Sequence, residues 1–436
     1  MRHYRTAQKL LEPYRSLLDV WVSHWFGNED ALNAFRLYPD QVDKAVKAAI
    51  RSGGRDEDRP DGVSEDVWEV VIDALSIAQT RRFFHWELEF PEVHHRGGQG
   101  QGCGFDAVVG NPPYDVLAEK ELGYDISDEM AFFRSQAVYE PSFRGKNNLY
   151  KLFICRGRQL VAPSGMFSFI VPMALLGDDQ AANVRRMLLE HMCLQLVEAF
   201  PQKDNPRRRV FPEAKLSMAV FVACAEHVDR PLQIRTHPGR YVEHSSPVLC
   251  VTPGDLLVFD LANAVIPSCT QKDWDIAVSI LGGNRMRRLG DYIVAYQGEV
   301  NETTDGRKGF VSSDPAVGPQ ILRGATVCMY ALREASQGTP IYLRKRSYLD
   351  GKPNSEKARH HKQCRIGWQE SCPQNNFRRV IAAPIPRGEF CNHKINYVPE
   401  AAAQVSLDSL LALLNSKLLD WYFRLGSTSA SVSHYQ

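Results

Sequence analysis

The stretch Phe105-Asp106-Ala107-Val108-Val109-Gly110-Asn111-Pro112-Pro113-Tyr114 decides the fold of this chain. Its first six residues are mainly apolar and end on a glycine, which predicts a short buried strand followed by a turn. The two prolines keep the next residues extended and remove two amide donors. The Asn111 side chain and the Pro112 carbonyl are therefore fixed polar groups at the carboxyl end of the strand, where open α/β sheets bind ligands.

These fixed groups suit a planar amino group as the ligand. Two acceptor oxygens can take both protons of an NH2 group, and the ring of Tyr114 offers a flat face for stacking. The alternative is purely structural: a Pro-Pro loop beside a buried tyrosine. The segments that surround the motif favour the binding site over this alternative.

The motif resembles that of the adenine-specific DNA methyltransferases that use S-adenosylmethionine. The resemblance implies that Asn111, Pro112, Pro113 and Tyr114 hold a flipped-out adenine, with the Asn111 side chain and the Pro112 carbonyl accepting its amine protons and Tyr114 stacking on its ring. Phe211, in Val210-Phe211-Pro212, matches a family position that packs against the same base; the alternative is an aromatic residue of the core. Protein-glutamine methyltransferases share the tetrapeptide, so it does not decide the substrate alone.

The resemblance also implies the chemistry. Adenine's exocyclic amine is a poor nucleophile because its lone pair is delocalised into the ring. Acceptors for both amine protons favour a more tetrahedral nitrogen, whose lone pair can attack the methyl sulfonium of the cofactor. Most of the rate is then expected to come from holding the nitrogen in line with the methyl group.

The composition is that of a soluble globular protein of two or three domains. The chain has 436 residues, of which 44% are hydrophobic and 24% charged. Its 52 basic and 51 acidic residues give a net charge of +1, so any contact with nucleic acid must come from local basic patches. Neither a signal peptide nor an apolar run long enough to span a membrane is expected, which indicates a cytoplasmic protein.

Metal and disulfide sites are not expected. The ten cysteines include no Cys-x-x-Cys pair, and the spacing of Cys364 and Cys372 matches no zinc signature, so reduced thiols are expected. His94-His95 and His360-His361 lie in Gly- or Lys/Arg-rich stretches and are interpreted as solvated loop residues rather than metal ligands. The glycines between Gly97 and Gly104 precede a strand instead of following one, which excludes a nucleotide-binding loop there.

Residues 1–80 are predicted to form a helical N-terminal segment. Apolar residues recur every three or four positions from Leu10 to Trp25, and a further helix is expected over about 64–80. The apolar face of the first helix faces either the core or another polypeptide, with the core favoured. Residues 83–93 resemble a segment that large adenine methyltransferases of restriction-type and phage-defence systems carry just before their Asn-Pro-Pro-Tyr strand.

Residues 81–228 are predicted to form the methyltransferase catalytic region. A helix from Asn148, strands over 166–171, 194–200 and 216–222, and a helix over 179–191 alternate, which indicates a mostly parallel sheet with helices on both faces. Residues 115–144 are expected to form a loop over the substrate cleft. The order of elements is similar to the family's, so the fold class is α/β, with a partial Rossmann-like methyltransferase sheet.

Residues 229–272 are predicted to be a connector, and residues 273–436 resemble the α+β target-recognition domain of the same enzymes. Strands are expected over 292–296 and 379–383, and one helix over 406–425. Basic residues cluster in three places, where the alternatives are a solvated face or contacts to DNA phosphates. The clusters contain Arg285, Arg287 and Arg288; Arg344, Lys345 and Arg346; and Lys357, Arg359 and Lys362.

One departure from the family pattern concerns the cofactor. The family's Gly-x-Gly cofactor loop lies upstream of the motif strand, and no segment before residue 105 matches it. We therefore expect this chain to be the C-terminal part of a larger methyltransferase, completed by an upstream polypeptide. The expected function is methyl transfer from S-adenosylmethionine to N6 of adenine in double-stranded DNA, within a restriction-modification or related defence system. The alternatives are a non-catalytic DNA-specificity fragment and a protein-glutamine methyltransferase.

Overall fold

The computed structural model describes residues 2–53, 55–95, 103–226, 228, 230–260, 262–281, 287–334, 338–373, 376–427 and 432. The chain divides into two compact units. The first contains Met1–Val171, Asn183–Leu196 and Val220–Arg230, and the second contains Pro172–Ala182, Val197–Ala219 and Pro231–Gln436. Within the described ranges, no helix has both the length and the apolar character needed to cross a bilayer. The domain boundaries at residues 80, 228 and 272 stay predictions.

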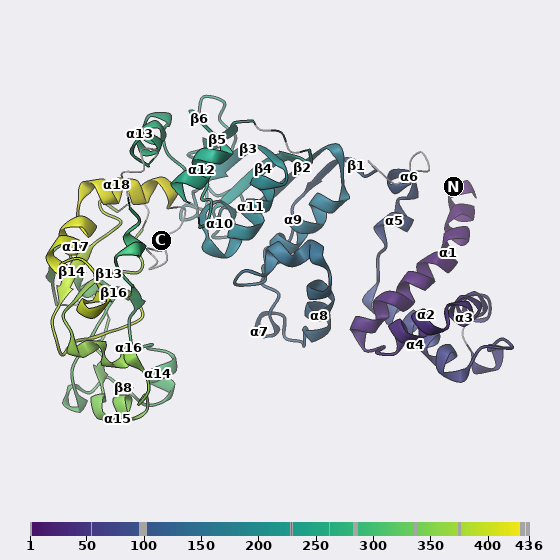
Figure 1. Cartoon of the computed structure of the whole chain (residues 1–436), viewed down its shortest axis with the longest axis horizontal. Coiled ribbons are helices and arrows are strands. Elements are labelled where there is room, and N and C mark those ends of the chain that lie inside the picture. The colour runs from purple at the N-terminus through teal and green to yellow at the C-terminus, as the bar shows by residue number, and fades with distance from the viewer. Residues whose placement is uncertain are drawn as a thin grey trace. The chain divides into compact units, whose positions relative to one another are not determined.

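A six-stranded sheet confirms the α/β class (Figure 1). The strand order is β1-β2-β4-β3-β5-β6; β1 pairs with β2 in parallel, and β5 pairs with β6 antiparallel. The last two strands come from the predicted connector, which therefore contributes to the sheet instead of only linking two parts. The strands are β1 Phe105–Gly110, β2 Val161–Pro172, β3 Cys193–Phe200, β4 Met218–Cys224, β5 Leu232–Thr236 and β6 Val248–Val251.

Strand β1 lies where the sequence predicts it, but it is not buried. Asp106, Ala107 and Val109 are exposed, and 79% of the Val109 surface is open to solvent. The reason is its position: β1 is the first strand of the sheet and has β2 as its one neighbour in the strand order. An apolar run of this kind is typical of a central strand, but in this chain it forms the edge strand β1.

Strand β2 begins at Val161 instead of the expected residue 166, and Pro163-Ser164-Gly165 lies inside it. The pairing shifts here: Phe105 aligns with Val161, but Ala107 aligns with Met166. Such an irregularity tolerates a proline that lacks an amide donor. A Cβ atom at position 165 would lie 2.7 Å from the Phe105 carbonyl oxygen, so the close approach of the two strands requires glycine.

Four helices form the predicted N-terminal segment: α1 Arg2–Ser23, α2 Ala31–Leu37, α3 Pro39–Ser52 and α4 Glu65–Arg81. The helix expected over 64–80 is confirmed. Val20, Val46 and Trp68 belong to one buried core shared by these helices. The outer face of α1 carries exposed apolar residues, among them Leu10 and Tyr14. Thus α1 faces the core on one side and leaves a second apolar stripe uncovered.

The segment 83–93 joins the helices to the sheet within the first unit. It forms two short helices, α5 Trp86–Glu89 and α6 Pro91–His94. The buried His85 ring lies 2.8 Å from the Asp19 carboxylate on α1, and the rings of Trp86 and Phe90 pack against Phe105 of β1. No role for these residues is predicted from the sequence. In the structure they connect α1 to β1.

Residues 115–144 are helical, which corrects the expectation of a loop. They form α7 Glu119–Leu122, α8 Ser127–Ser135 and the 3-10 helix η4 Ala137–Phe143. Leu117 and Ile126 form a small core with Leu152 of α9 (Leu149–Leu160). The apolar residues of this segment are spread thinly among polar ones, and their core is completed by a helix that lies later in the chain.

The remaining helices of the central region follow the sheet strands. The predicted helix over 179–191 is observed as a 3-10 turn followed by α11, and the former connector contains α12. These elements are α10 Ala174–Gly177, η5 Asp179–Ala181, α11 Ala182–Glu190, α12 Pro253–Phe259 and α13 Gln271–Leu281.

The C-terminal part is built on a four-stranded sheet with the order β14-β13-β16-β7. The strand expected over 292–296 begins only at Tyr296, and the one expected over 379–383 begins at Ala382. The sheet contains β7 Tyr296–Gln297, β13 Arg365–Gln369, β14 Ala382–Ile385 and β16 Ile395–Pro399. Three two-stranded pairs and three short helices surround it: β8 Val311–Ser312 with β12 Tyr342–Leu343, β9 Ile321–Leu322 with β15 Phe390–Cys391, β10 Val327–Cys328 with β11 Ala331–Leu332, α14 Thr304–Arg307, α15 Lys345–Asp350 and α16 Glu356–Arg359.

His360 and His361 are buried, which corrects their interpretation as solvated loop residues. The ring of His360 lies 3.1 Å from the Tyr397 hydroxyl, and that of His361 stacks on Phe390. Burial lowers the pKa of both histidines from their usual 6.5. The basic sequence around them suggested solvent, but it is their neighbours Lys362 and Arg359 that face outward.

The single helix expected over 406–425 is two helices, α17 Leu407–Leu414 and α18 Lys417–Gly426. Ser406 caps the first and Ser416 the second, each accepting a backbone N–H. Between them, the buried Asn415 side chain accepts from the Ala382 amide at 3.0 Å and donates to the Ala382 carbonyl at 2.9 Å. The break therefore joins the helices to strand β14.

We expect Asn415→Ala to destabilise the C-terminal part by about 1–3 kcal/mol, because it leaves the buried Ala382 amide without its acceptor. It also removes one of the two donors to the Ala382 carbonyl, which keeps the hydrogen bond from the Tyr330 amide. Hydrogen exchange at the Ala382 amide should accelerate accordingly. Asn354→Ala removes an exposed asparagine of the same part and serves as the control. Equal stability of the two variants would contradict the anchoring role of Asn415.

A second prediction concerns the stability of the C-terminal part at acid pH. Because the pKa values of His360 and His361 are lowered in the folded state, the unfolded chain binds more protons below pH 6.5, and stability falls as the pH drops through that window. The double variant His360→Gln/His361→Gln should show a smaller loss of protection between pH 7.5 and 5.5, measured by hydrogen exchange in β13 and β16. His95→Gln, at an exposed histidine, should leave the pH dependence unchanged.

Candidate active site

The tetrapeptide Asn111–Tyr114 continues directly from β1 and has no regular secondary structure. Gly110 aligns with Phe169 of β2, and a Cβ atom at position 110 would lie 2.9 Å from the Phe169 ring. Glycine is therefore needed where the chain leaves the sheet. Asn111 and Pro113 are exposed, whereas Pro112 is buried, so the prolines fix the segment and leave the asparagine facing solvent.

Tyr114 lies beside Asn111. Its hydroxyl donates a hydrogen bond to the Asn111 side-chain oxygen Oδ1, and it lies 3.4 Å from the Ile170 carbonyl of β2. Partial burial raises the pKa of Tyr114, so the hydroxyl stays a neutral donor. An amide oxygen has two lone pairs, and one of them remains for a second donor. The contact fixes the direction of the Asn111 acceptor while that acceptor keeps capacity for a ligand.

The residues after the motif are held by the start of α9. Leu149 donates its backbone N–H to the Asp115 carbonyl at 2.9 Å, and Leu117 donates to the Asn147 carbonyl at 2.8 Å. The fully buried Lys151 reaches back, with Nζ 2.9 Å from the Arg144 carbonyl. The segment Asn148-Leu149-Tyr150-Lys151, at the predicted helix start, therefore supports the chain on the carboxyl side of the motif.

Phe211 lies on the long loop between β3 and β4, in the second unit, and is half-buried. Arg209 folds this loop on itself by donating to the carbonyls of Lys203 and Pro212. The neighbouring Arg207 and Arg208 are exposed. The motif belongs to the first unit, so the packing of Phe211 on a bound base stays a prediction. The run Arg207-Arg208-Arg209 before Phe211 is the sequence signal for this basic loop.

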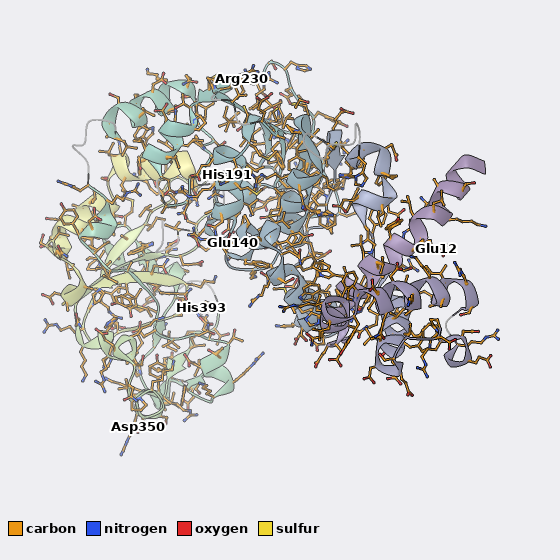
Figure 2. All side chains as sticks on the ribbon, turned by 45° about the vertical axis from the view of Figure 1, so that its right-hand side comes forward. Glu12, Glu140, His191, Arg230, Asp350 and His393 are labelled. Carbon is orange, nitrogen blue, oxygen red and sulfur yellow. The ribbon has the colours of Figure 1, made fainter. Side chains whose placement is uncertain are left out.

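Most of the predicted phosphate-contact residues are on the surface. Arg287, Arg288 and Lys362 are exposed, and Arg285 lies outside the described residues. Arg344, Lys345 and Arg346 are exposed at the start of α15, where Arg346 is paired only loosely with Asp350 at 3.9 Å, a residue labelled in Figure 2. Lys357 is half-buried, and burial lowers its pKa. The exposed residues are available for phosphate contacts, which stay a prediction.

The described residues do not fit a complete cofactor site. Before β1 they form helices α1 to α6, with no strand that leads through a glycine loop into a helix. Two hollows of about 420 and 460 Å³ lie along α13 and share Asp275 and Ser279, and neither is lined by Asn111–Tyr114. The described residues also contain no group of three or more His, Cys, Asp or Glu side chains placed to hold a metal ion. The motif is thus a surface element at the end of an edge strand.

Comparisons with known proteins find similarity to restriction-modification methyltransferases. Residues 33–205 match the model of the Eco57I restriction-modification methylase family. A protein of Methanocaldococcus jannaschii described as a type II restriction enzyme and methyltransferase is 26% identical over 121 residues. That match covers 27% of this chain and 8% of the relative, so the chain spans a small share of the length of the relative it matches.

Solved structures show a weaker likeness. The type IIL restriction-modification enzyme MmeI in complex with DNA aligns with 98% of this chain and 66% of its own, at 10% identity and a TM-score of 0.47. A nuclease-deletion mutant of the type ISP restriction-modification enzyme LlaGI, with a DNA substrate mimic, aligns with 85% of this chain and 45% of its own, at 11% identity and a TM-score of 0.45. Neither TM-score reaches 0.5, so the assignment rests on the sequence matches and the motif. On that basis, residues 33–205 of this chain, which contain the motif, are similar to methyltransferases of the restriction-modification type.

Proposed function

We propose that this chain holds the target base in a DNA adenine-N6 methyltransferase that uses S-adenosylmethionine, within a restriction-modification or related defence system. One observation carries the proposal: the exposed Asn111 side chain is fixed at the carboxyl end of β1, with its oxygen oriented by Tyr114. That edge of an α/β sheet is where ligands bind. A nucleobase cannot reach such a pocket from within a duplex, so the adenine must be extruded.

The chain's own residues would act on the amine of the base. The Asn111 Oδ1 atom and the Pro112 carbonyl would each accept a hydrogen bond from one N–H of the amine, which makes the nitrogen lone pair available for attack. The Tyr114 ring would stack on the base and hold its plane. The prolines remove local flexibility, so binding orients the nitrogen at small entropic cost. S-adenosylmethionine would supply the electrophilic methyl group when bound.

We further propose that an upstream polypeptide supplies the cofactor-binding half and adds a strand beside β1. The two edges of the sheet differ in a way that supports this. At β6 the Gln271 side chain pairs with both backbone groups of Cys250, at 2.8 and 3.2 Å, and so covers that edge. At β1 the terminal strand presents the exposed Val109. A terminal strand with exposed apolar residues is a template for an added strand.

Two other functions fit parts of the molecule. A non-catalytic DNA-specificity fragment would use the exposed basic residues without the motif, but it gives no reason for an oriented, exposed asparagine. A protein-glutamine methyltransferase would use Asn111 on a side-chain amide, but it leaves the large C-terminal part without a role. Offering DNA and peptide substrates with labelled cofactor separates these functions, because label found only in peptide contradicts the DNA proposal.

We expect Asn111→Ala to reduce methyl transfer to DNA by at least about 100-fold in the enzyme reconstituted with its upstream polypeptide, since it removes an acceptor that acts in the transition state. DNA affinity should change less than about twofold, because the main affinity comes from phosphate contacts. Tyr114→Phe keeps the ring and loses the contact to Asn111, so a reduction of roughly fivefold is expected. Asn33→Ala, at an exposed helical asparagine, is the control; unchanged turnover in Asn111→Ala would refute the role.

The partner proposal is tested by calorimetry with S-adenosylmethionine. The isolated chain should give no binding heat, whereas the chain with its upstream polypeptide should. Val109→Lys should weaken assembly of the two polypeptides at least about tenfold, because a charge would be buried at the added strand. Val248→Lys, on the opposite edge strand β6, is the matched control and should assemble normally. Cofactor binding by the chain alone would show that no partner is required.

A further inference from the structure

The loop between β3 and β4, residues 201–217, carries a local excess of positive charge. It lies wholly in the second unit, and the structure describes all of its residues. Residues 203–215 contain five basic and two acidic side chains, a net charge of +3 in a chain whose total is +1. Charged loop residues are most often simply solvated, so the charge alone does not indicate a ligand. The arrangement of the individual side chains does.

Part of this charge is used within the loop, and part of it is not. The guanidinium of Arg209 holds the loop together through its hydrogen bonds to two backbone carbonyls of the same loop. Lys215 is exposed and pairs with Asp204 at 3.5 Å. Arg207 and Arg208 are also exposed, but neither has a carboxylate partner among the residues that the structure describes. Two adjacent cations therefore face solvent with their charge uncompensated.

The backbone that carries Arg207 and Arg208 is fixed. The Asn205 side-chain oxygen accepts the Arg207 N–H at 3.0 Å, and the Asn205 carbonyl accepts the Arg208 N–H at 2.9 Å. At the base of the loop, the Ser217 hydroxyl donates to the Pro201 carbonyl at 2.8 Å. Because the turn is already ordered, a ligand has to immobilise only the two side chains, which lowers the entropic cost of binding.

Arg207 and Arg208 suit a ligand with neighbouring anionic groups. A guanidinium is planar, stays charged and can donate two parallel hydrogen bonds to one phosphate. Two guanidinium groups on a fixed turn can therefore hold two phosphates at once. A DNA strand carries a phosphate at every nucleotide and can satisfy both arginines, whereas a single free phosphate can satisfy only one of them.

We propose that Arg207 and Arg208 bind neighbouring phosphates of a DNA strand. The inference rests on the proposed function, which supplies DNA as the ligand. Phe211, on the same loop, is predicted from the family resemblance to pack on the extruded adenine, and this packing would bring the phosphates of that nucleotide to the loop. Contacts to the backbone carry no sequence information, so the two arginines contribute to affinity and position rather than to the choice of target sequence.

The proposal is tested with a labelled duplex of arbitrary sequence, whose binding to the full chain is measured by fluorescence anisotropy at several salt concentrations. Each phosphate contact adds about 0.9 to the slope of log affinity against log salt. Arg207→Ala/Arg208→Ala should therefore lower the slope by about 2, and at about 0.1 M salt it should weaken binding roughly 10- to 60-fold. Arg207→Lys/Arg208→Lys keeps both charges and should keep the slope.

Arg36→Ala/Arg51→Ala is the matched control. It removes two exposed arginines of α2 and α3, and thus the same net charge, and it should leave the slope unchanged. Thermal unfolding of both alanine variants should match that of the unaltered chain, because the four side chains are exposed. Pyrophosphate, added at constant ionic strength, distinguishes a small phosphate ligand from the DNA backbone.

The proposal is overturned if Arg207→Ala/Arg208→Ala keeps the slope of the unaltered chain, if the control pair lowers it equally, or if no duplex binds. It is also overturned if the substitutions weaken binding of pyrophosphate or of an acidic peptide but not of the duplex. Loss of duplex affinity as expected, together with no methyl transfer to DNA by the enzyme reconstituted with its upstream polypeptide, would contradict the proposed function and leave the phosphate contacts in place.

Discussion

The close packing of β1 on β2 is the constraint on which the candidate site depends. Phe169 occupies the space beside Gly110, so the chain can leave the sheet here only without a side chain. Asn111 then lies directly after the end of the strand, and the two prolines that follow hold its side-chain oxygen in that position. The contact from Tyr114 adds direction, and the hydrogen bonds from the start of α9 hold the residues that follow. The glycine, the prolines, Tyr114 and the start of α9 thus all restrict the position of Asn111 and of the residues beside it.

The position of the motif at the end of a strand was predictable from sequence because its signals are local. A glycine, two prolines and an aromatic residue each restrict the backbone near themselves, so Asn111–Tyr114 could be placed at a strand end before any fold was known. Phe211 lies on the loop before β4, and the relation of that loop to the motif depends on long-range packing, so its role stays a prediction. The role of Lys151 was not predictable, since a buried lysine is recognised only by the carbonyl it reaches.

The errors in the fold have one physical cause: local patterns do not report what covers a segment. Val109 lies in an apolar run typical of a central strand, but its strand is at the edge of the sheet. His360 and His361 are surrounded in sequence by exposed cations and yet are packed against Tyr397 and Phe390. The helix expected over 406–425 is continuous in its apolar pattern, and the break at Asn415 follows from two hydrogen bonds to a strand more than thirty residues away. Periodicity describes one face of an element, whereas tertiary partners decide where it ends.

The unequal edges of the six-stranded sheet bear on how this chain is used. A sheet exposed at both ends would be prone to pairing without specificity, and folded proteins therefore cover or interrupt their edges. In this chain one edge is covered at Cys250 by Gln271 from α13. The Gln271 side chain makes the two backbone hydrogen bonds that a neighbouring strand would make. The other edge is the strand that leads to the motif. A parallel strand added there would end beside Asn111, because the carboxyl ends of parallel strands meet at one side of a sheet. Whatever that strand carried at its end would lie beside the Asn111 oxygen, which is where a methyl donor would be needed.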